Sequence, residues 1–238
     1  LRLIDPARIN LPTPSVQDLR SQPARERVLL RSFAGSGQFT PDQIRQMRHY
    51  YYARAAFADA MMGRLLDYLR AHDLLENTVV AMTADHGTHL ADQGLVQKQT
   101  FYEQVATVPM ILAGPGVRRG VRVKAPAGTV GLLPALLELA GLDASGVDGR
   151  SLLRHTGGPV RSEIAFGYQG YRDTERQVMI REGDWKLSMF ATGDPDGSLY
   201  NLKHDPAESV NLFGRAEYAP VQRRLARRSV DHVPRGIR

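Results

Sequence analysis

Residues 77–103 constrain the fold of this chain more than any other stretch. An apolar run rich in β-branched residues, 78–82, follows a long helical pattern and leads into Asp85, His86 and Gly87. A run of this length in this setting predicts a buried parallel strand. Ligands of open α/β sheets bind beyond the carboxyl ends of the strands. We therefore expect Asp85 and His86 to lie at the edge of a cleft.

Lys98 follows His86 by twelve residues and completes a chemically coherent group. A carboxylate and an imidazole are ligands for a divalent cation. A cation beside an ammonium favours a tetrahedral oxyanion such as sulfate or phosphate, because both positive charges stabilise the ester and its leaving oxygen. A short Asp-His pattern also occurs in strand-end turns with no ligand, so the pattern alone leaves both interpretations open.

The flanking segments predict a long helix before this stretch and a small sheet after it. Thr40, Pro41 and Gln43 form a capping-box signature that begins a helix over 40–72. Its apolar and aromatic residues recur at helical spacing, which predicts a core-facing stripe. Beyond residue 160, short apolar runs separated by turns predict an antiparallel sheet, and 218–230 predicts a final covering helix.

Composition excludes several classes of function. The 31 Lys and Arg residues exceed the 25 Asp and Glu residues, giving a net charge of +6, but no basic stripe is interleaved with aromatics. We therefore expect no nucleic-acid partner. No apolar window is long enough to predict a membrane span. The absence of cysteine excludes disulfides, thiolate metal sites and a cysteine nucleophile, and it favours a cytoplasmic location, although the start of the sequence does not indicate the compartment. The oligomeric state is not indicated.

The order of motifs along the chain resembles the sulfatase family of the alkaline phosphatase superfamily, in the C-terminal part of its domain. The matching segments are 83–87, 94–98, Tyr102-Glu103, 108–112 and 205–212. The resemblance implies an α/β fold: an incomplete, mostly parallel sheet sandwiched by helices, plus a small C-terminal antiparallel sheet with a helix. We expect residues 1–158 to belong to the catalytic domain and 159–238 to form the C-terminal subdomain.

The resemblance also implies the chemistry of a sulfuric ester hydrolase. Asp85 and His86 match metal ligands, and Lys98 matches a contact to the sulfate of a small-molecule ester. The implied metal is calcium, with manganese or magnesium as alternatives. The family oxidises a cysteine to a formylglycine nucleophile. Because this chain has no cysteine, the formylglycine is expected in an N-terminal part outside it.

Three alternatives follow from the same residues. Ser21 lies in Ser-x-Pro-x-Arg, the serine form of the nucleophile signature, but the residues before it do not fit, so a surface-loop serine is the expected role. Phosphonate and phosphate ester hydrolases of the superfamily share the Asp-His-Gly pattern. A catalytically incomplete chain that acts only in binding is the third.

The sequence departs from the family pattern beside the proposed site residues. Ala84 replaces the usual serine, while Gln97 and Gln99 replace glycines beside the lysine, which affects the expected shape of the loop. His89 is expected to be a loop residue near the site. The candidate rim residues of the substrate pocket are Arg118, Arg119 and Tyr171.

Overall fold

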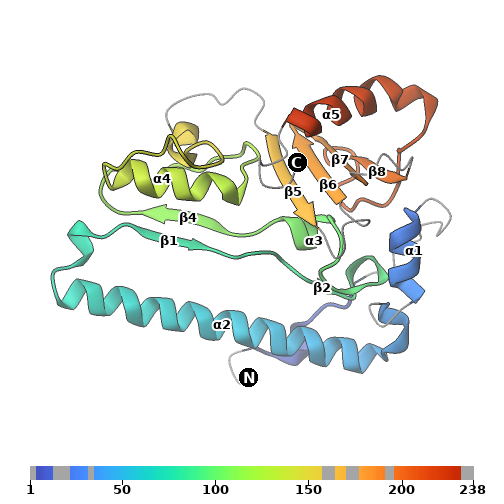
Figure 1. The fold of residues 1–238 in the computed structure, drawn as a ribbon. Coiled ribbons are helices and arrows are strands. Elements are labelled where there is room, and N and C mark those ends of the chain that lie inside the picture. Colours follow the sequence, from blue (N-terminus) through green and yellow to red (C-terminus); the bar gives the residue numbers. More distant parts are fainter. Residues whose placement is uncertain are drawn as a thin grey trace.

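The computed structural model describes residues 4–12, 22–31, 35–156, 164–169, 177–190 and 196–231. Figure 1 shows one long helix, a pair of short strands beside it and a separate small sheet with its own helix. The helices are α1 (Ala24–Arg31), α2 (Pro41–Ala71), α3 (Glu103–Ala106), α4 (Leu132–Leu139) and α5 (Ala219–Asp231). The strands are β1 (Val80–Thr83), β2 (His89–Leu90), β3 (Val96–Gln97), β4 (Met110–Ala113), β5 (Ile164–Gln169), β6 (Gln177–Glu182), β7 (Trp185–Phe190) and β8 (Gly197–Asn201). Short 3-10 helices include η1 (Pro6–Arg8), η4 (Leu75–Asn77), η6 (Thr129–Gly131) and η7 (Leu152–Thr156).

The predicted capping box begins α2 as expected. The Thr40 hydroxyl accepts a hydrogen bond from the Gln43 backbone N–H at 3.3 Å, and the Gln43 side chain accepts one from the Thr40 N–H at 2.8 Å. Two N–H groups that the helix cannot satisfy itself are therefore paired, which fixes where α2 starts. The helix then runs for 31 residues to Ala71.

β1 pairs with β4, and the pairing is antiparallel. Val80 lies opposite Ala113 and Thr83 opposite Met110. The expectation that β1 pairs as a parallel strand is therefore wrong for this partner. Residues 84–109 connect the two strands through a short hairpin and the single turn of α3, which is too short to cover a sheet face as the helix of a parallel crossover does. Every ladder in the described ranges is antiparallel, so the mostly parallel sheet is not confirmed.

The aromatic stripe of α2 is not a core in this chain. None of the residues of α2 is buried. Large side chains on it are exposed, with relative exposures of 48% for Tyr50, 63% for Phe57 and 57% for Tyr68. In Figure 1, α2 follows one side of the β1–β4 pair, while α4 lies on the other. The prediction of a core-facing stripe is wrong here because periodicity identifies an apolar face but not the surface that covers it.

The C-terminal sheet and its covering helix confirm the prediction for that region. β5, β6, β7 and β8 form an antiparallel meander in chain order. α5 packs on β6 and β7. Ile180, Leu187, Leu199 and Leu225 form the fully buried centre of this packing. Each such side chain contributes roughly 1.5–3 kcal/mol relative to an exposed one.

A second buried cluster joins this sheet to the segment that follows Lys98. Leu95, Tyr102 and Tyr200 are each almost fully buried, and Leu29 and Leu30 of α1 pack against them. β8, α1 and residues 95–102 therefore share one small core. The predicted boundary at residues 158 and 159 lies outside the described residues and stays a prediction. None of the helices that the structure describes is long and apolar enough to cross a bilayer.

Candidate active site

Asp85 and His86 emerge side by side from the turn after β1. Asp85 Oδ1 accepts a hydrogen bond from the His86 backbone N–H at 2.8 Å. Asp85 Oδ2 lies 3.3 Å from His86 Nε2. The Asp85 side chain is 83% exposed and that of His86 34%. Both groups therefore face the same accessible space, as two ligands of one ion must.

The contacts of the His86 ring determine its tautomer. Nδ1 lies 2.7 Å from the carbonyl oxygen of Gly87, which can only accept, so Nδ1 carries the proton. In the neutral ring Nε2 is then the lone-pair nitrogen, the one that binds metals. Lys98 Nζ lies 2.6 Å from this atom. The structure thus brings together the three predicted site residues.

The carboxyl of Asp85 is held in its charged form. The backbone N–H of His86 is the main cause that lowers the pKa of Asp85, and the nearby charge of Lys98 lowers it further. A carboxylate at neutral pH is the form that binds a cation.

Gly87 fixes the distance between this turn and α3. Its N–H donates to the carbonyl oxygen of Val105 at 2.8 Å. A Cβ at Gly87 would lie 2.1 Å from the Gln104 carbonyl oxygen, which no side chain tolerates. The absence of a side chain therefore allows the backbone of α3 to approach the Asp85–His86 turn.

The loop before Lys98 holds non-glycine residues in the left-handed region. φ is +72° at Ala91, +56° at Gln93 and +75° at Gln97. Gln97 also lies at a position where the family pattern has glycine, so the structure adopts a glycine conformation with a glutamine. Its carbonyl accepts from Thr88 Oγ1 at 3.1 Å, which ties the loop to the start of β2.

His89 lies in β2 and is buried, so the expectation of a loop residue is wrong. It is 1% exposed, and its Nε2 contacts Thr100 Oγ1 at 2.7 Å. Burial lowers the pKa of His89 to about 4, outweighing the opposite effect of Asp92. The ring is neutral and packs edge-on against Tyr102, with 5.8 Å between ring centroids. This is a structural histidine at the base of the Lys98 loop.

Asp85, His86 and Lys98 line a cavity of about 940 Å³ whose wall is largely apolar and whose charged side chains are mainly cationic. Its cationic side chains are those of Lys98, Arg118, Arg122, Lys124 and Arg181, and its acidic ones are those of Asp85 and Glu103. This excess of positive charge favours an anionic ligand. Of the predicted rim residues Arg118 lines the cavity, Arg119 is not among its lining, and Tyr171 lies outside the described residues, as does Ser21.

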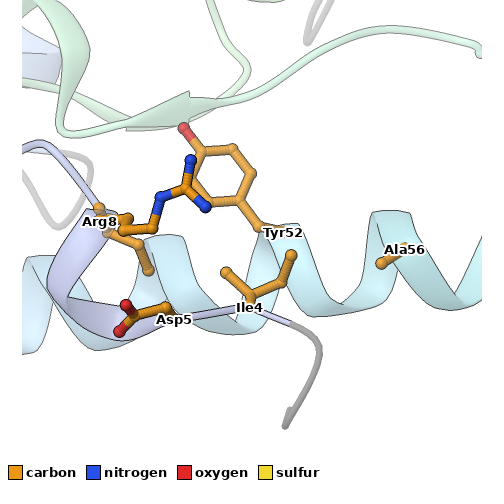
Figure 2. A pocket seen from close by; sticks show the side chains of 6 residues that line it. Ile4, Asp5, Arg8, Tyr52 and Ala56 are labelled. Carbon is orange, nitrogen blue, oxygen red and sulfur yellow. The ribbon is translucent and has the colours of Figure 1, made fainter.

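Another hollow, of about 450 Å³, lies against α2 near the start of the chain. Figure 2 shows Asp5, Arg8 and Tyr52 around it. It shares no residue with the Asp85 cavity and contains no predicted site residue.

Comparison with known proteins identifies the family. The sulfatase family model matches residues 22–142, and the model "N-sulphoglucosamine sulphohydrolase, C-terminal" matches residues 91–233. This chain belongs to the sulfatase family. The two matches together cover both the Asp85–Lys98 site and the C-terminal sheet.

Two curated relatives are similar over most of this sulfatase chain. A choline-sulfatase of Rhizobium meliloti (strain 1021) is 32% identical over 195 residues, which are 80% of this chain and 38% of the relative. Arylsulfatase K of Danio rerio is 33% identical over 186 residues, or 74% of this chain and 36% of the relative. The chain thus spans less than two fifths of the length of these relatives.

Solved structures support the fold. The structure of BT4656 in complex with its substrate D-glucosamine-2-N,6-O-disulfate has a TM-score of 0.62 and 30% identity, covering 73% of this chain and 37% of its own. The phosphonate monoester hydrolase SpPMH from Silicibacter pomeroyi has a TM-score of 0.83 and 23% identity, covering 97% of this chain and 51% of its own. At that identity the second likeness concerns the fold alone.

The donor set of this sulfatase site fits part of a metal centre. Asp85 offers carboxylate oxygens, and His86 offers a lone-pair nitrogen whose ring is oriented by the Gly87 carbonyl, an arrangement typical of metal-binding histidines. Within the described ranges no group of three or more His, Cys, Asp or Glu side chains converges. Two donors are fewer than a structural or catalytic metal requires, so further ligands are needed.

Sequence reasoning missed a charged cluster that extends from the cavity wall, where Glu103 and Arg181 lie, to the buried Lys186 and Glu208. Glu103, Lys186 and Glu208 contact one another, and Arg181 contacts Glu103. The strand pattern gave no signal for its burial: Trp185 and Leu187 face the core under α5, so alternation places Lys186 on the opposite face, where a lysine is usually exposed. Lys186 is buried there because it is paired.

Proposed function

We propose that this chain is the metal- and sulfate-binding part of a sulfuric ester hydrolase. The single observation that carries the proposal is the contact of His86 Nε2 with both Asp85 Oδ2, at 3.3 Å, and Lys98 Nζ, at 2.6 Å, in a cationic cavity of a sulfatase-family chain. The substrate class is a small-molecule sulfate ester, the chemistry named for both the choline-sulfatase and the arylsulfatase K relatives.

Each of the three residues has a defined role in this proposal. Asp85 contributes a carboxylate oxygen to the cation, and His86 contributes Nε2. The Lys98 ammonium binds a sulfate oxygen and stabilises the negative charge that develops during ester cleavage. A bound divalent cation supplies Lewis-acid polarisation of the sulfate.

Calcium is the cation that the family resemblance implies, with manganese or magnesium as alternatives. An imidazole nitrogen is an uncommon ligand for calcium, which prefers oxygen, and it is more usual for transition metals. The test therefore compares calcium, manganese and magnesium added separately to protein stripped with a chelator.

The nucleophile and the remaining metal ligands are proposed to lie in polypeptide that this chain does not span. The relatives are more than twice as long. The exposure of Tyr50, Phe57 and Tyr68 on α2 supports further covering structure, because contiguous apolar surface of this kind usually packs against another element. Ser21 is the alternative nucleophile within the chain.

The experiment measures turnover by the full-length protein with aryl sulfate and aryl phosphonate monoester substrates, with each metal in turn. The proposal predicts metal-dependent aryl sulfate hydrolysis that Asp85→Asn reduces by at least about 100-fold. Asp143→Asn is the matched control, since it removes another exposed, turn-forming carboxylate that is not in the cavity lining.

Each alternative has its own outcome. Preferential hydrolysis of the phosphonate monoester would support the second activity, whose enzymes share the Asp-His-Gly pattern. Metal binding without turnover of either ester would support a chain that acts only in binding. Loss of turnover on Ser21→Ala would identify Ser21 as the nucleophile.

A further inference from the structure

Lys186 is a buried cation next to the candidate site, and all three of its N–H groups have an acceptor. Its side chain is 2% exposed. Nζ donates to the carbonyl oxygen of Phe101 at 2.8 Å and to Glu103 Oε1 at 2.9 Å, and it forms an ion pair with Glu208 Oε1. An ammonium has three donors, and here each has an acceptor.

The charges around Lys186 balance. Arg181 on β6 lies directly opposite Lys186 on β7 in the sheet register. Two like charges at such positions repel, but Glu103 accepts from both, with Arg181 Nη1 2.9 Å from Glu103 Oε2. Glu208 supplies the second negative charge. Two cations and two carboxylates thus form a neutral, largely buried cluster.

The pKa values reflect this pairing. Burial alone would raise the pKa of Glu103, but Lys186 and Arg181 outweigh burial and hold it below its usual value. For Glu208 burial dominates, and its pKa is raised despite Lys186. Loss of the Lys186 charge would raise the pKa of Glu208 further.

This cluster is connected to both halves of the candidate site. Glu208 Oε2 accepts from the Glu103 backbone N–H at 2.7 Å, at the first turn of α3. The same helix accepts from Gly87, the residue next to His86, through Val105. The Phe101 carbonyl held by Lys186 lies three residues beyond Lys98. One buried ammonium is thus linked by short backbone paths to the Asp85–His86 turn and to the Lys98 loop.

We propose that Lys186, together with Glu208, is a positioning residue that sets the placement of Lys98 relative to the Asp85–His86 turn. The predicted effect of Lys186 on turnover rests on the proposed function. Its predicted effect on the order of residues 85–101 does not. Lys186 touches neither substrate nor metal in this account. It acts through the Phe101 carbonyl and through α3, and a misplacement of about 1 Å at reacting groups lowers rates on the order of 100-fold.

The test replaces Lys186 with Met, which keeps the length of the side chain and removes the charge. The matched control is Ser188→Ala, on the same strand and face, which breaks a buried hydrogen bond to Ser198 of 2.7 Å but touches neither α3 nor residue 101. We expect Lys186→Met to speed amide exchange over residues 85–101 and to lower kcat/KM by about 10- to 100-fold, whereas Ser188→Ala leaves both unchanged.

A second variant keeps the test decisive if Lys186→Met does not fold. The pair Lys186→Met with Glu208→Gln removes one positive and one negative charge, so the remaining Arg181 and Glu103 still balance. The Gln oxygen can still accept from the Glu103 N–H, but the Phe101 carbonyl has lost its donor. We expect exchange over 85–101 to remain faster than in the wild type.

The two readouts separate the two proposals. A folded double variant with wild-type exchange over 85–101 and wild-type kcat/KM would overturn the positioning role. If the wild type hydrolyses neither ester, the proposed function fails, while the exchange measurement still decides whether Lys186 orders the site. Equal losses of kcat/KM in Ser188→Ala and Lys186→Met would show that Lys186 contributes only to general stability. That result would also overturn the positioning role of Lys186.

Discussion

Lys98 Nζ lies 2.6 Å from His86 Nε2, at the ring nitrogen that the Gly87 carbonyl leaves unprotonated. The two residues come from different segments, the turn after β1 and the end of the β2–β3 hairpin. Their contact means that the proposed cation ligand, His86, is directly adjacent to the proposed anion ligand, Lys98. Because the ammonium occupies the lone pair of Nε2, Lys98 has to move off this atom before His86 can hold an ion, and an oxyanion bound by Lys98 would then lie beside that ion.

Removing the Lys98 charge should weaken turnover more than it weakens metal binding. Lys98→Met is expected to lower kcat/KM for an aryl sulfate by about 100- to 1,000-fold, because a donor to the developing negative charge is lost. Metal affinity, measured by calorimetry, should stay within a few-fold or rise, since one positive charge next to His86 is gone. Lys203→Met, at another exposed lysine, is the control. Unchanged kcat/KM in Lys98→Met would contradict the assignment.

Gly87→Ala should displace α3 from the Asp85–His86 turn. The new methyl carbon would lie 2.1 Å from the Gln104 carbonyl oxygen, which is backbone and cannot rotate away. We expect a loss of roughly 1–3 kcal/mol in the free energy of unfolding, measured by denaturant titration, and a decrease in metal affinity. The control is Gly63→Ala in α2, where no atom lies within 4 Å. That change should stabilise the helix by about 1 kcal/mol.

Features encoded by a few adjacent residues were predictable from the sequence. The Thr40–Gln43 capping box is local, and it begins α2 where expected. The strands of the C-terminal sheet follow apolar runs separated by turns, and their antiparallel pairing follows from short connections. The grouping of Asp85, His86 and Lys98 was predicted from their order in a family pattern.

Features that depend on distant partners were not predictable in the same way. Nothing local in β1 specifies whether its neighbour runs parallel or antiparallel, and the partner turned out to be antiparallel β4. The stripe of α2 was expected to be core, but none of the segments that the structure describes covers Tyr50 or Phe57. The Lys186 cluster draws residues from four segments, so no sequence window contains it.

The strained conformation of Gln97 predicts a stabilising substitution in the Lys98 loop. With φ at +75°, Gln97 pays a steric cost that glycine avoids. Gln97→Gly should therefore raise the free energy of unfolding by up to about 1 kcal/mol. Gln99→Gly, two residues on and outside the left-handed region, should lower it by at least about 0.5–1 kcal/mol, because glycine there adds freedom to the unfolded chain and removes the side-chain oxygen that accepts from the Lys98 N–H. Equal effects of the two changes would contradict this account of the loop.

The buried Glu26 of α1, which contacts Tyr102, should make the free energy of unfolding decrease as the pH rises. Its carboxyl is buried, and burial raises the pKa of Glu26 to about 7. The geometry agrees: the Tyr102 hydroxyl contacts Gln22 Oε1 at 2.6 Å and Glu26 Oε2 at 2.8 Å. A single hydroxyl proton serves only one acceptor, so a protonated Glu26 that donates to Tyr102 satisfies both contacts.

The sign follows from proton binding. Between pH about 4.5 and 7 the folded state holds a Glu26 proton that the unfolded chain releases, so the free energy of unfolding decreases as pH rises through this window. The shift corresponds to roughly 3 kcal/mol. Glu26→Gln keeps a donor for Tyr102 and carries no charge. It should flatten the decrease and leave the variant more stable than the wild type at pH 8, by up to that amount.

The control separates this effect from general charge removal. Glu76→Gln removes an exposed carboxylate in η4 and should leave the pH profile unchanged. His89 acts in the opposite direction: its pKa is lowered to about 4, so its contribution is lost as pH falls from about 6.5 towards 4. The two effects oppose each other between pH about 4.5 and 6.5, so the contribution of Glu26 is read from the difference in free energy of unfolding between Glu26→Gln and the wild type, by denaturant titrations of the full-length protein at pH 5, 6.5 and 8. If Glu26→Gln is less stable than the wild type at pH 8, the buried carboxyl is charged there and stabilised by a partner, and the predicted sign is wrong.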